Sequence, residues 1–340
     1  MSKLLTIVVP VYKVEQYINK CLDSCIIYKN DADGNPMLDD ELMNLLEVII
    51  VNDGTPDNSA ELSREYTLRY PQTFRQIDKE NGGHGSAWNV GVKEATGKYL
   101  RFLDSDDWLT NLDKLMHKLK NCEADLVFTH RRDFYIDTNE YLMQCNQGPY
   151  DVISSVSNIN QFNFADHIGT TNFWLTTYKT ELIKNSHPLF LEKVRYDDCI
   201  LFTFPLLMAK TYVVYDFVVY NYLLGRAGQS VDEKQVQLHM DERVKTYIYA
   251  YKTILSICAE QQMPDAVKHS FTGQAILLMD LCSKYSYKTF LLTQSFIPKF
   301  APIDYVEFKN SKIYKRYIVL PHLIFYCVQQ LRKLINKLRK

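Results

Sequence analysis

Residues 81–108 read NGGHGSAWNVGVKEATGKYLRFLDSDDW, and they contain a turn, a helix and a strand in quick succession. The glycine-rich start predicts a turn, and small or apolar residues then recur at helical spacing up to Ala95. A turn at Gly97 leads to a short apolar strand, Tyr99–Leu103, which is followed directly by Asp104-Ser105-Asp106-Asp107. Because open α/β sheets bind ligands at the carboxyl ends of their strands, we expect a functional site at this point.

The four residues after the strand, the acidic turn, are an unfavourable strand end unless a cation lies among them, because like charges repel. Hard cations such as Mg²⁺ and Mn²⁺ prefer carboxylate oxygens, and they typically bind one or two carboxylates together with substrate phosphates. We therefore predict that Asp104 and Asp106 bind Mn²⁺ or Mg²⁺. The alternative is an acidic N-cap for a helix that begins near Thr110, and this is the expected role for Asp107 or Thr110.

The composition is that of an ordinary globular protein. The 340 residues, 46% apolar and 23% charged, suffice for one large core or two domains. A formal net charge of −1 argues against a nucleic-acid-binding protein. The eight cysteines include no CxxC pair, so we expect buried reduced thiols. The apolar run at the N-terminus is too short for a signal peptide, and no run of about 18 apolar residues occurs, so we expect a cytoplasmic protein.

Two more strand patterns precede the acidic turn. Leu4–Val11 and Glu47–Val51 are nearly continuous apolar, β-branched runs, which are typical of parallel strands buried on both faces. Helical spacing follows the first at residues 14–27 and the second at residues 59–70. This alternation predicts an α/β fold with a doubly wound, mostly parallel sheet.

Two common phosphate-binding motifs are excluded. Gly83-His84-Gly85 is followed by Trp88 where a dinucleotide fingerprint requires glycine, and residues 91–99 have the wrong spacing for a P-loop. A nucleotide bound here would be held in another way.

Three motifs together resemble the family 2 glycosyltransferases of the GT-A fold. They are Val9-Pro10-Val11-Tyr12, then Asn52-Asp53-Gly54-Thr55, then residues 81–108 with their Leu-Asp-Ser-Asp-Asp-Trp ending. The resemblance covers roughly residues 3 to 230. It implies a GT-A-type sheet and an inverting transferase that moves a sugar from a UDP-sugar to a hydroxyl of a glycan or lipid-linked acceptor, in cell-surface polysaccharide synthesis.

The resemblance also implies roles for residues of the donor site. Asp53 is similar to the carboxylate that accepts the uracil N3–H, and Pro10 and Tyr12 resemble residues that line the base pocket. A carboxylate acceptor suits an imide N–H and would reject the acceptor ring nitrogen of cytosine. Asn81 and its glycines would let the backbone approach the ribose and diphosphate.

Two further points concern the diphosphate. Asp104 and Asp106 resemble the family's metal-binding DxD motif, with Asp104 also at the donor. The family often has Ala-Arg-Asn where this chain has Ala87-Trp88-Asn89, so an expected diphosphate cation is missing.

Later segments resemble the family's catalytic parts. Asp197-Asp198 is similar to an acidic pair that opens a helix, which makes Asp198 the general base and Asp197 a donor-sugar contact. A helix N-cap pair is the compatible alternative. Residues 220–230 resemble a loop that closes over the diphosphate, where Arg226 would neutralise leaving-group charge or would simply lie on the surface. Trp174 is expected either to stack on a sugar or to lie in the core.

The carboxyl end differs from the rest. We expect a catalytic domain in residues 1–230, a helical region in residues 231–311 and a basic amphipathic helix in residues 312–340. Between Lys309 and Lys340 there are nine Lys or Arg and no Asp or Glu. Such a helix suits an anionic membrane surface, at the inner face of the membrane. The alternative is a helix packed on the protein itself or on a partner.

Two other classes of protein are weighed against a transferase. A sugar-1-phosphate nucleotidyltransferase shares carboxylate and metal chemistry, but it requires a glycine-rich basic loop after the first strand, and residues 12–17 are not one. A non-catalytic glycan- or nucleotide-binding protein does not require four such carboxylates, namely Asp53, Asp104, Asp106 and Asp198.

Overall fold

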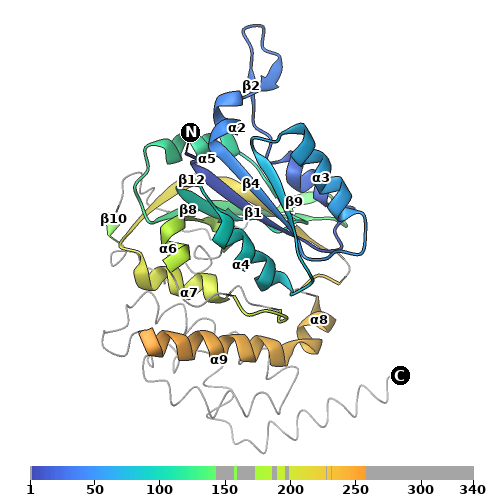
Figure 1. Cartoon of the computed structure of the whole chain (residues 1–340), viewed down its shortest axis with the longest axis vertical. Helices are drawn as coiled ribbons and strands as arrows, with labels where there is room; N and C mark the ends of the chain where they lie inside the picture. Colours follow the sequence, from blue (N-terminus) through green and yellow to red (C-terminus); the bar gives the residue numbers. More distant parts are fainter. Residues whose placement is uncertain are drawn as a thin grey trace, which may run out of the picture.

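The computed structural model describes residues 2–142, 157–158, 173–185, 190–195, 199–226, 228–230 and 232–257. These residues form one large sheet with helices on both faces (Figure 1). Its strands are β1 (Leu5–Val11), β4 (Leu46–Asn52), β5 (Phe74–Asp78), β6 (Tyr99–Phe102), β7 (Trp108–Leu109), β8 (Leu126–Tyr135), β9 (Glu140–Leu142), β10 (Ser157–Asn158), β11 (Thr176–Lys179) and β12 (Thr211–Leu224).

The helices cover the two faces of this sheet, and a small hairpin projects from the body at the top of Figure 1. The helices are α1 (Ile18–Asp23), α2 (Asp40–Leu45), α3 (Ser59–Arg69), α4 (His84–Glu94), α5 (Leu112–Lys120), α6 (Thr180–Asn185), α7 (Cys199–Met208), α8 (Glu233–Leu238) and α9 (Met240–Ile257). The hairpin consists of β2 (Tyr28–Asn30) and β3 (Pro36–Leu38), and a 3₁₀ turn, η2 (Phe173–Leu175), precedes β11.

The strand order of the large sheet is β10-β12-β8-β11-β6-β1-β4-β5, with β7 paired to β12 and β9 paired to β8. Strands β5, β4, β1 and β6 are all parallel, and β12 is parallel to β8. Strand β11 lies between β6 and β8 and is antiparallel to both. The predicted α/β fold is confirmed, with a mixed sheet whose parallel half carries the first three sequence motifs.

The central strands are buried on both faces because their apolar side chains alternate between two cores. In β1, Ile7 packs in the core beneath α1 and α5, whereas Val8 packs in the core beneath α4 and α7. In β4, Ile50 and Ile49 divide in the same way. Both strand predictions agree with the structure to within one residue at each end.

Helix α4 lies unusually close to β1 because Gly91 has no side chain. A Cβ at this position would lie 2.1 Å from Cγ1 of Val8, which is far inside van der Waals contact. The glycine therefore sets the distance at which α4, and the turn before it, stands over the parallel strands.

Two expectations differ from the structure. The helix predicted for residues 14–27 is shorter, because residues 14–17 form a turn and α1 spans only Ile18–Asp23. Residues 220–224 were expected in a loop, but they end β12, where Tyr220 and Tyr222 are buried in the core. Burial of these aromatic side chains favours a strand here, although the sequence resembles a loop.

The described helices after residue 230 belong to the same body as the sheet. Val236 of α8 and Val244 of α9 lie in the core that also contains Val8, and α9 packs along α7 beneath the sheet (Figure 1). Within the described residues no helix has the length and apolarity needed to cross a bilayer. The predicted basic helix, residues 312–340, lies outside the described residues.

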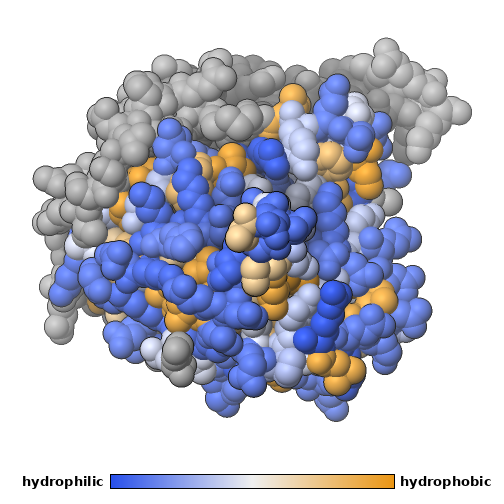
Figure 2. All heavy atoms as spheres, turned by 90° about the horizontal axis from the view of Figure 1, so that it is seen from above, coloured by the Kyte–Doolittle hydropathy of each residue, from blue (hydrophilic) through white to orange (hydrophobic). Residues whose placement is uncertain are grey.

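The surface seen from above is mostly hydrophilic, and its apolar side chains form small separate groups (Figure 2). The described cysteines Cys21, Cys25 and Cys122 are free and buried, in agreement with the prediction for this part of the chain.

Candidate functional site

The ends of β1 and β4 bring the predicted base-pocket residues together. The Asp53 N–H donates to the Val11 carbonyl at 3.0 Å, so the residues after β4 lie beside those that end β1. Pro10 is buried in β1, and Tyr12, the first residue beyond it, is exposed. The structure thus places Pro10, Tyr12 and Asp53 at one edge of the sheet.

The buried Asp53 carboxylate holds the glycine turn. Its Oδ1 accepts hydrogen bonds from Lys79 Nζ at 2.7 Å and from the Gly82 N–H at 2.9 Å, and its Oδ2 accepts one from the Gly83 N–H at 2.8 Å. The Asn81 side chain donates to the Asp53 carbonyl at 2.9 Å. A carboxylate has roughly four acceptor positions, so these three bonds leave one for a ligand N–H.

The same turn starts α4 and leads to the acidic turn. Gly83 has a φ of 87°, in the left-handed region that favours glycine, and its amide is bound to Asp53. The next residue, His84, begins α4, and its Nε2 lies 3.2 Å from Oδ1 of Asp104. Asp53 and Asp104 are therefore connected through the two residues that join the turn to the helix.

Trp88, which stands where the family often has arginine, is a core residue. It is fully buried, and its ring packs on Phe102, Phe173 and Phe190 with centroids 4.8 to 5.0 Å apart. On its other side it contacts the His84 ring at 4.0 Å. Trp88 thus packs between His84 and the aromatic core.

Strand β12 fixes the acidic turn from the other side. The Tyr220 hydroxyl accepts a hydrogen bond from the Asp104 N–H at 3.2 Å and donates one to Oδ2 of Asp107 at 2.6 Å. The other Asp107 oxygen accepts from the Leu223 N–H at 2.7 Å. Sequence reasoning missed Tyr220, because no local pattern pairs a strand tyrosine with a distant acidic turn.

The N-cap role expected for Asp107 or Thr110 is wrong. Helix α5 begins at Leu112, and its N-cap residue is Asn111, which makes no side-chain cap hydrogen bond. Both oxygens of Asp107 are used by β12 instead, because a buried carboxylate needs partners more than an exposed helix end does.

Asp106 and Arg226, which are far apart in the sequence, form an ion pair. Arg226 Nη2 lies 2.7 Å from Oδ2 of Asp106, both side chains are partly or largely buried, and the guanidinium carbon lies 5.6 Å from the centroid of the Tyr17 ring. Burial raises the pKa of Asp106, the Arg226 charge opposes this, and the Asp104 charge adds to it. A predicted metal ligand and a predicted donor-binding residue therefore meet at the acidic turn.

The charges of the acidic turn suit a divalent cation. Burial raises the pKa of Asp107 well above its usual value, and the charges of Asp106 and Asp104 contribute. Asp104 and Asp106 offer hard oxygen ligands, and a bound cation would relieve the repulsion between them. Within the described residues no group of three or more His, Cys, Asp or Glu side chains converges on one point. A metal at this turn would therefore need ligands besides Asp104 and Asp106, such as the phosphates of a bound ligand.

Arg101 is a second residue that sequence reasoning missed. It lies fully buried in β6, donates to Thr177 Oγ1 at 2.8 Å and to the Trp174 carbonyl, and has its guanidinium carbon 6.0 Å from the centroid of the Tyr220 ring. Burial lowers the pKa of Arg101 to about 10. It is the only charged residue in the apolar run 99–103, and that exception is the signal that could have identified it.

The Trp174 ring packs against two other aromatic rings. Its ring lies 5.2 Å from that of Tyr222 and 4.6 Å from that of Phe173, so the structure supports the core role more directly than stacking on a sugar. Asp197 and Asp198 lie outside the described residues, and α7 begins with the next residue, Cys199.

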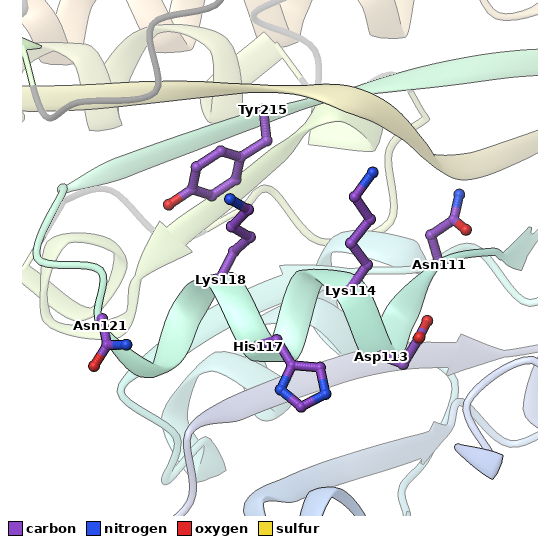
Figure 3. A pocket seen from close by; sticks show the side chains of 7 residues that line it. All are labelled: Asn111, Asp113, Lys114, His117, Lys118, Asn121 and Tyr215. Atoms are coloured by element: carbon purple, nitrogen blue, oxygen red, sulfur yellow. The ribbon is translucent and has the colours of Figure 1, made fainter. Parts of the chain in front are cut away.

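A separate hollow of about 650 Å³ lies along the outer face of α5 (Figure 3). Lys114 and Lys118 line it, and their Nζ atoms lie 4.3 Å from the Phe217 ring centroid and 5.4 Å from that of Tyr215. It contains no residue of the acidic turn or of the glycine turn. We assign it no part in the site.

Comparisons with known proteins identify the family of this chain. The model of glycosyl transferase family 2 matches residues 6–178. The uncharacterized glycosyltransferase EpsJ of Bacillus subtilis (strain 168) is 30% identical over 205 residues, which cover 58% of this chain and 54% of EpsJ. The minor teichoic acid biosynthesis protein GgaB of the same organism is 36% identical over 127 residues, which cover 36% of this chain and 13% of GgaB. The chain spans about half the length of EpsJ and much less of GgaB.

One solved structure supports the fold. S. aureus TarS 1-349 in complex with UDP-GlcNAc aligns with a TM-score of 0.51 and 17% identity, over 82% of this chain and 81% of that one. At this identity the similarity concerns the arrangement of strands and helices.

Proposed function

Because the chain belongs to glycosyl transferase family 2 and is therefore a glycosyltransferase, we propose that it carries out a metal-dependent, inverting transfer of a sugar from a UDP-sugar to a hydroxyl. The observation that carries this proposal is the acidic turn, where Asp106 binds Arg226 and Asp104 binds His84. Family membership argues against both alternatives, a sugar-1-phosphate nucleotidyltransferase and a non-catalytic binding protein.

The donor base is recognised at the ends of β1 and β4. Asp53 has one acceptor position left, which suits the N3–H of uracil, and Pro10 and Tyr12 would lie against the base. Asn81 and the glycines that follow would lie along the ribose and diphosphate. The UDP-GlcNAc in the TarS complex supports this choice of nucleotide.

The diphosphate, which is part of the leaving group, would bind at the acidic turn. Asp104 and Asp106 would hold Mn²⁺ or Mg²⁺, which when bound supplies positive charge to the diphosphate oxygens. Arg226 already lies at this point and would add its own charge, in the bidentate geometry that arginine offers to phosphates. Asp197 would contact the donor sugar.

The transfer needs one base on the acceptor side. The acceptor hydroxyl oxygen attacks the anomeric carbon from the face opposite the diphosphate, its proton passes to the Asp198 carboxylate, and the bond to the diphosphate oxygen breaks to release UDP. This in-line attack inverts the configuration of the anomeric carbon.

The acceptor is proposed to be a glycan or a lipid-linked saccharide. The name of GgaB refers to teichoic acid biosynthesis, which supports a role in the synthesis of a cell-surface polysaccharide. We place the reaction in the cytoplasm at the inner face of the membrane, where the basic helix predicted for residues 312–340 would bind anionic lipid.

Calorimetry of the full chain with UDP, GDP and CDP tests the donor site. We expect UDP with Mn²⁺ to bind at least about tenfold more tightly than GDP or CDP with Mn²⁺, because only uracil offers an imide that matches Asp53 without a larger ring. A chelator should weaken UDP binding. Equal affinity for the three nucleotides, or no effect of the chelator, contradicts the proposal.

Two asparagine variants provide the matched comparison. Asp106→Asn removes a proposed metal ligand and should weaken UDP binding in the presence of Mn²⁺. Asp113→Asn changes an exposed carboxylate on α5, away from the acidic turn, and should bind UDP like the wild type.

A further inference from the structure

His84 is placed to act on a proposed metal ligand. Its Nε2 lies 3.2 Å from Oδ1 of Asp104, and the two side chains are 38% and 22% exposed. An ionised carboxylate, the form that binds a metal, can only accept, so this contact is a hydrogen bond when the imidazole carries a hydrogen on Nε2. The imidazole therefore donates to Asp104.

The imidazole is held from two directions. At its backbone, the preceding Gly83 is fixed by the buried carboxylate of Asp53. At its ring, Trp88 lies 4.0 Å away, with a tilt of 54° between the two planes. Trp88 is itself wedged among buried aromatic rings, so it has little freedom to move.

The rest of Asp104 is fixed as well. Its N–H donates to the Tyr220 hydroxyl, and its carbonyl accepts from the Asp107 N–H at 3.0 Å. The backbone of Asp104 is thus set by the turn and by β12, and the rotation of its carboxylate is set by His84. Among the described residues, the only hydrogen bond to the Asp104 carboxylate is the one from His84 to Oδ1, so Oδ2 and a second lone pair of Oδ1 remain for a cation.

We propose that His84 is a positioning residue, which orients the Asp104 carboxylate for a divalent metal, and that Trp88 supports its ring. This inference rests on the proposed function, because it assumes that Asp104 is a metal ligand. Partners that hydrogen-bond to metal ligands fix their orientation, and their loss typically lowers metal affinity by about 10- to 100-fold.

A direct role for His84 as a ligand is the alternative. A ligating imidazole nitrogen must offer a lone pair to the metal. The Nε2 atom faces the Asp104 oxygen and carries a hydrogen in this arrangement. The geometry therefore favours orientation of Asp104 over direct binding.

Two amide variants separate these roles. Glutamine reaches about as far as the His84 Nε2 and can donate to Asp104, whereas asparagine is one carbon shorter and cannot reach it. Both lack the imidazole. We expect His84→Asn to weaken Mn²⁺ binding about 10- to 100-fold and His84→Gln to retain most of the wild-type affinity.

Mn²⁺ binding is measured on the full chain by electron paramagnetic resonance of the free ion, with UDP present at a fixed concentration. UDP binding in the presence of chelator is measured in parallel and should be the same for all variants, because the His84 ring contacts Asp104 and Trp88 and the base is proposed to bind at Pro10, Tyr12 and Asp53. His117→Asn, on the outer face of α5, is the control and should match the wild type in both measurements.

Each outcome decides a different point. If the wild type binds no Mn²⁺, the proposed function fails. If the wild type binds and His84→Asn binds equally well, the positioning role is wrong. If His84→Gln is as weak as His84→Asn, His84 acts as a ligand or as packing, and the proposal is overturned. Should His84→Asn lower the thermal midpoint, His84→Ala replaces it in the same comparison with His84→Gln.

Discussion

Asp107 shows how one residue of the acidic turn combines structural and electrostatic roles. It is 1% exposed, and both of its oxygens accept hydrogen bonds from β12. These bonds fix the turn that carries Asp104 and Asp106. A negative charge is costly for this carboxylate, because it is buried and lies beside two other acids, and this is why the pKa of Asp107 is raised.

The raised pKa predicts how stability depends on pH. The folded chain holds a proton on Asp107 more tightly than the unfolded chain does, so the stability that this residue contributes is fully present below the ordinary carboxyl pKa of about 3.9. That stability is lost as the pH rises through the folded-state pKa. We expect the wild type to lose thermal stability relative to Asp107→Asn as the pH rises from about 4.5 to about 8.

Thermal unfolding of the two proteins across this pH range measures the effect. Each pKa unit of difference between the folded and unfolded states corresponds to about 1.4 kcal/mol in the free energy of unfolding. Asp113→Asn changes an exposed carboxylate and should follow the wild type at every pH. A constant difference between the wild type and Asp107→Asn would mean that Asp107 does not titrate as described.

At the scale of elements, the loop after β12 carries Arg226 to the acidic turn. Nη2 of Arg226 lies 2.7 Å from Oδ2 of Asp106, the carboxylate that we propose as a metal ligand. A cation that binds Asp106 must therefore share this carboxylate with Arg226 or displace it. Once a diphosphate is present, the guanidinium has a second anionic partner.

This competition predicts opposite effects of one substitution. We expect Arg226→Gln to raise the affinity for Mn²⁺ alone several-fold, because the competing charge is gone. We expect the same change to weaken UDP binding in the presence of Mn²⁺ by roughly tenfold, because a phosphate partner is lost. Calorimetry at pH 8 measures both affinities.

Arg64→Gln is the matched control for this substitution. Arg64 of α3 also pairs with an aspartate, Asp78, at 3.0 Å, but that pair is exposed and lies away from the acidic turn. Its loss should change neither affinity. If Arg226→Gln shifts both affinities in the same direction, competition for Asp106 is not the cause.

The elements that could be predicted from the sequence are strands that would be buried whichever elements pack against them. The runs at residues 4–11, 47–51 and 99–103 are apolar on both faces, so any parallel sheet would bury them, and their ends are correct to within one residue. Residues 220–224 were assigned to a loop by resemblance, although their aromatic side chains pack as a strand.

The sequence supplies candidate residues for the site, but it does not supply their pairings. The spacing of Asp104 and Asp106 identifies a candidate metal site, but no local rule pairs Asp106 with Arg226 or Asp104 with His84. These contacts depend on which strands are neighbours in the sheet. The capping rule for Asp107 failed for the same reason, because a tertiary partner replaced the local one.

At the scale of the whole molecule, the sheet and the helices as far as residue 257 share a core. Helix α9 packs on α7, and Ala250 and Ile254 of α9 lie fully buried in the cluster that also contains Val8 of β1. The proposed donor site lies at the carboxyl ends of the strands, and the described helices after residue 230 add to the core on one face of the sheet. The positive charge that would favour membrane binding lies further along the chain, in residues 309–340.

The basic segment, residues 309–340, is the part of the chain that we expect to bind an anionic membrane. Residues 309–340 contain nine Lys or Arg and no Asp or Glu, while the described carboxylates of the proposed site all precede residue 108. Each basic residue near an anionic surface contributes about 1 kcal/mol, and salt screens this attraction over about 10 Å at 0.1 M. We expect removal of residues 312–340 to release the protein from anionic vesicles and to leave hydrolysis of a UDP-sugar nearly unchanged.

Sedimentation with phosphatidylglycerol vesicles at low and high salt tests this expectation, with phosphatidylcholine vesicles as the neutral control. The full chain should sediment with anionic vesicles at low salt, less so at high salt, and hardly at all with neutral ones. A helix packed on the protein's own core would behave differently, because its removal would expose apolar surface and lower the thermal midpoint. A full chain that ignores anionic vesicles, or a truncated chain that unfolds, would therefore assign residues 312–340 to the core.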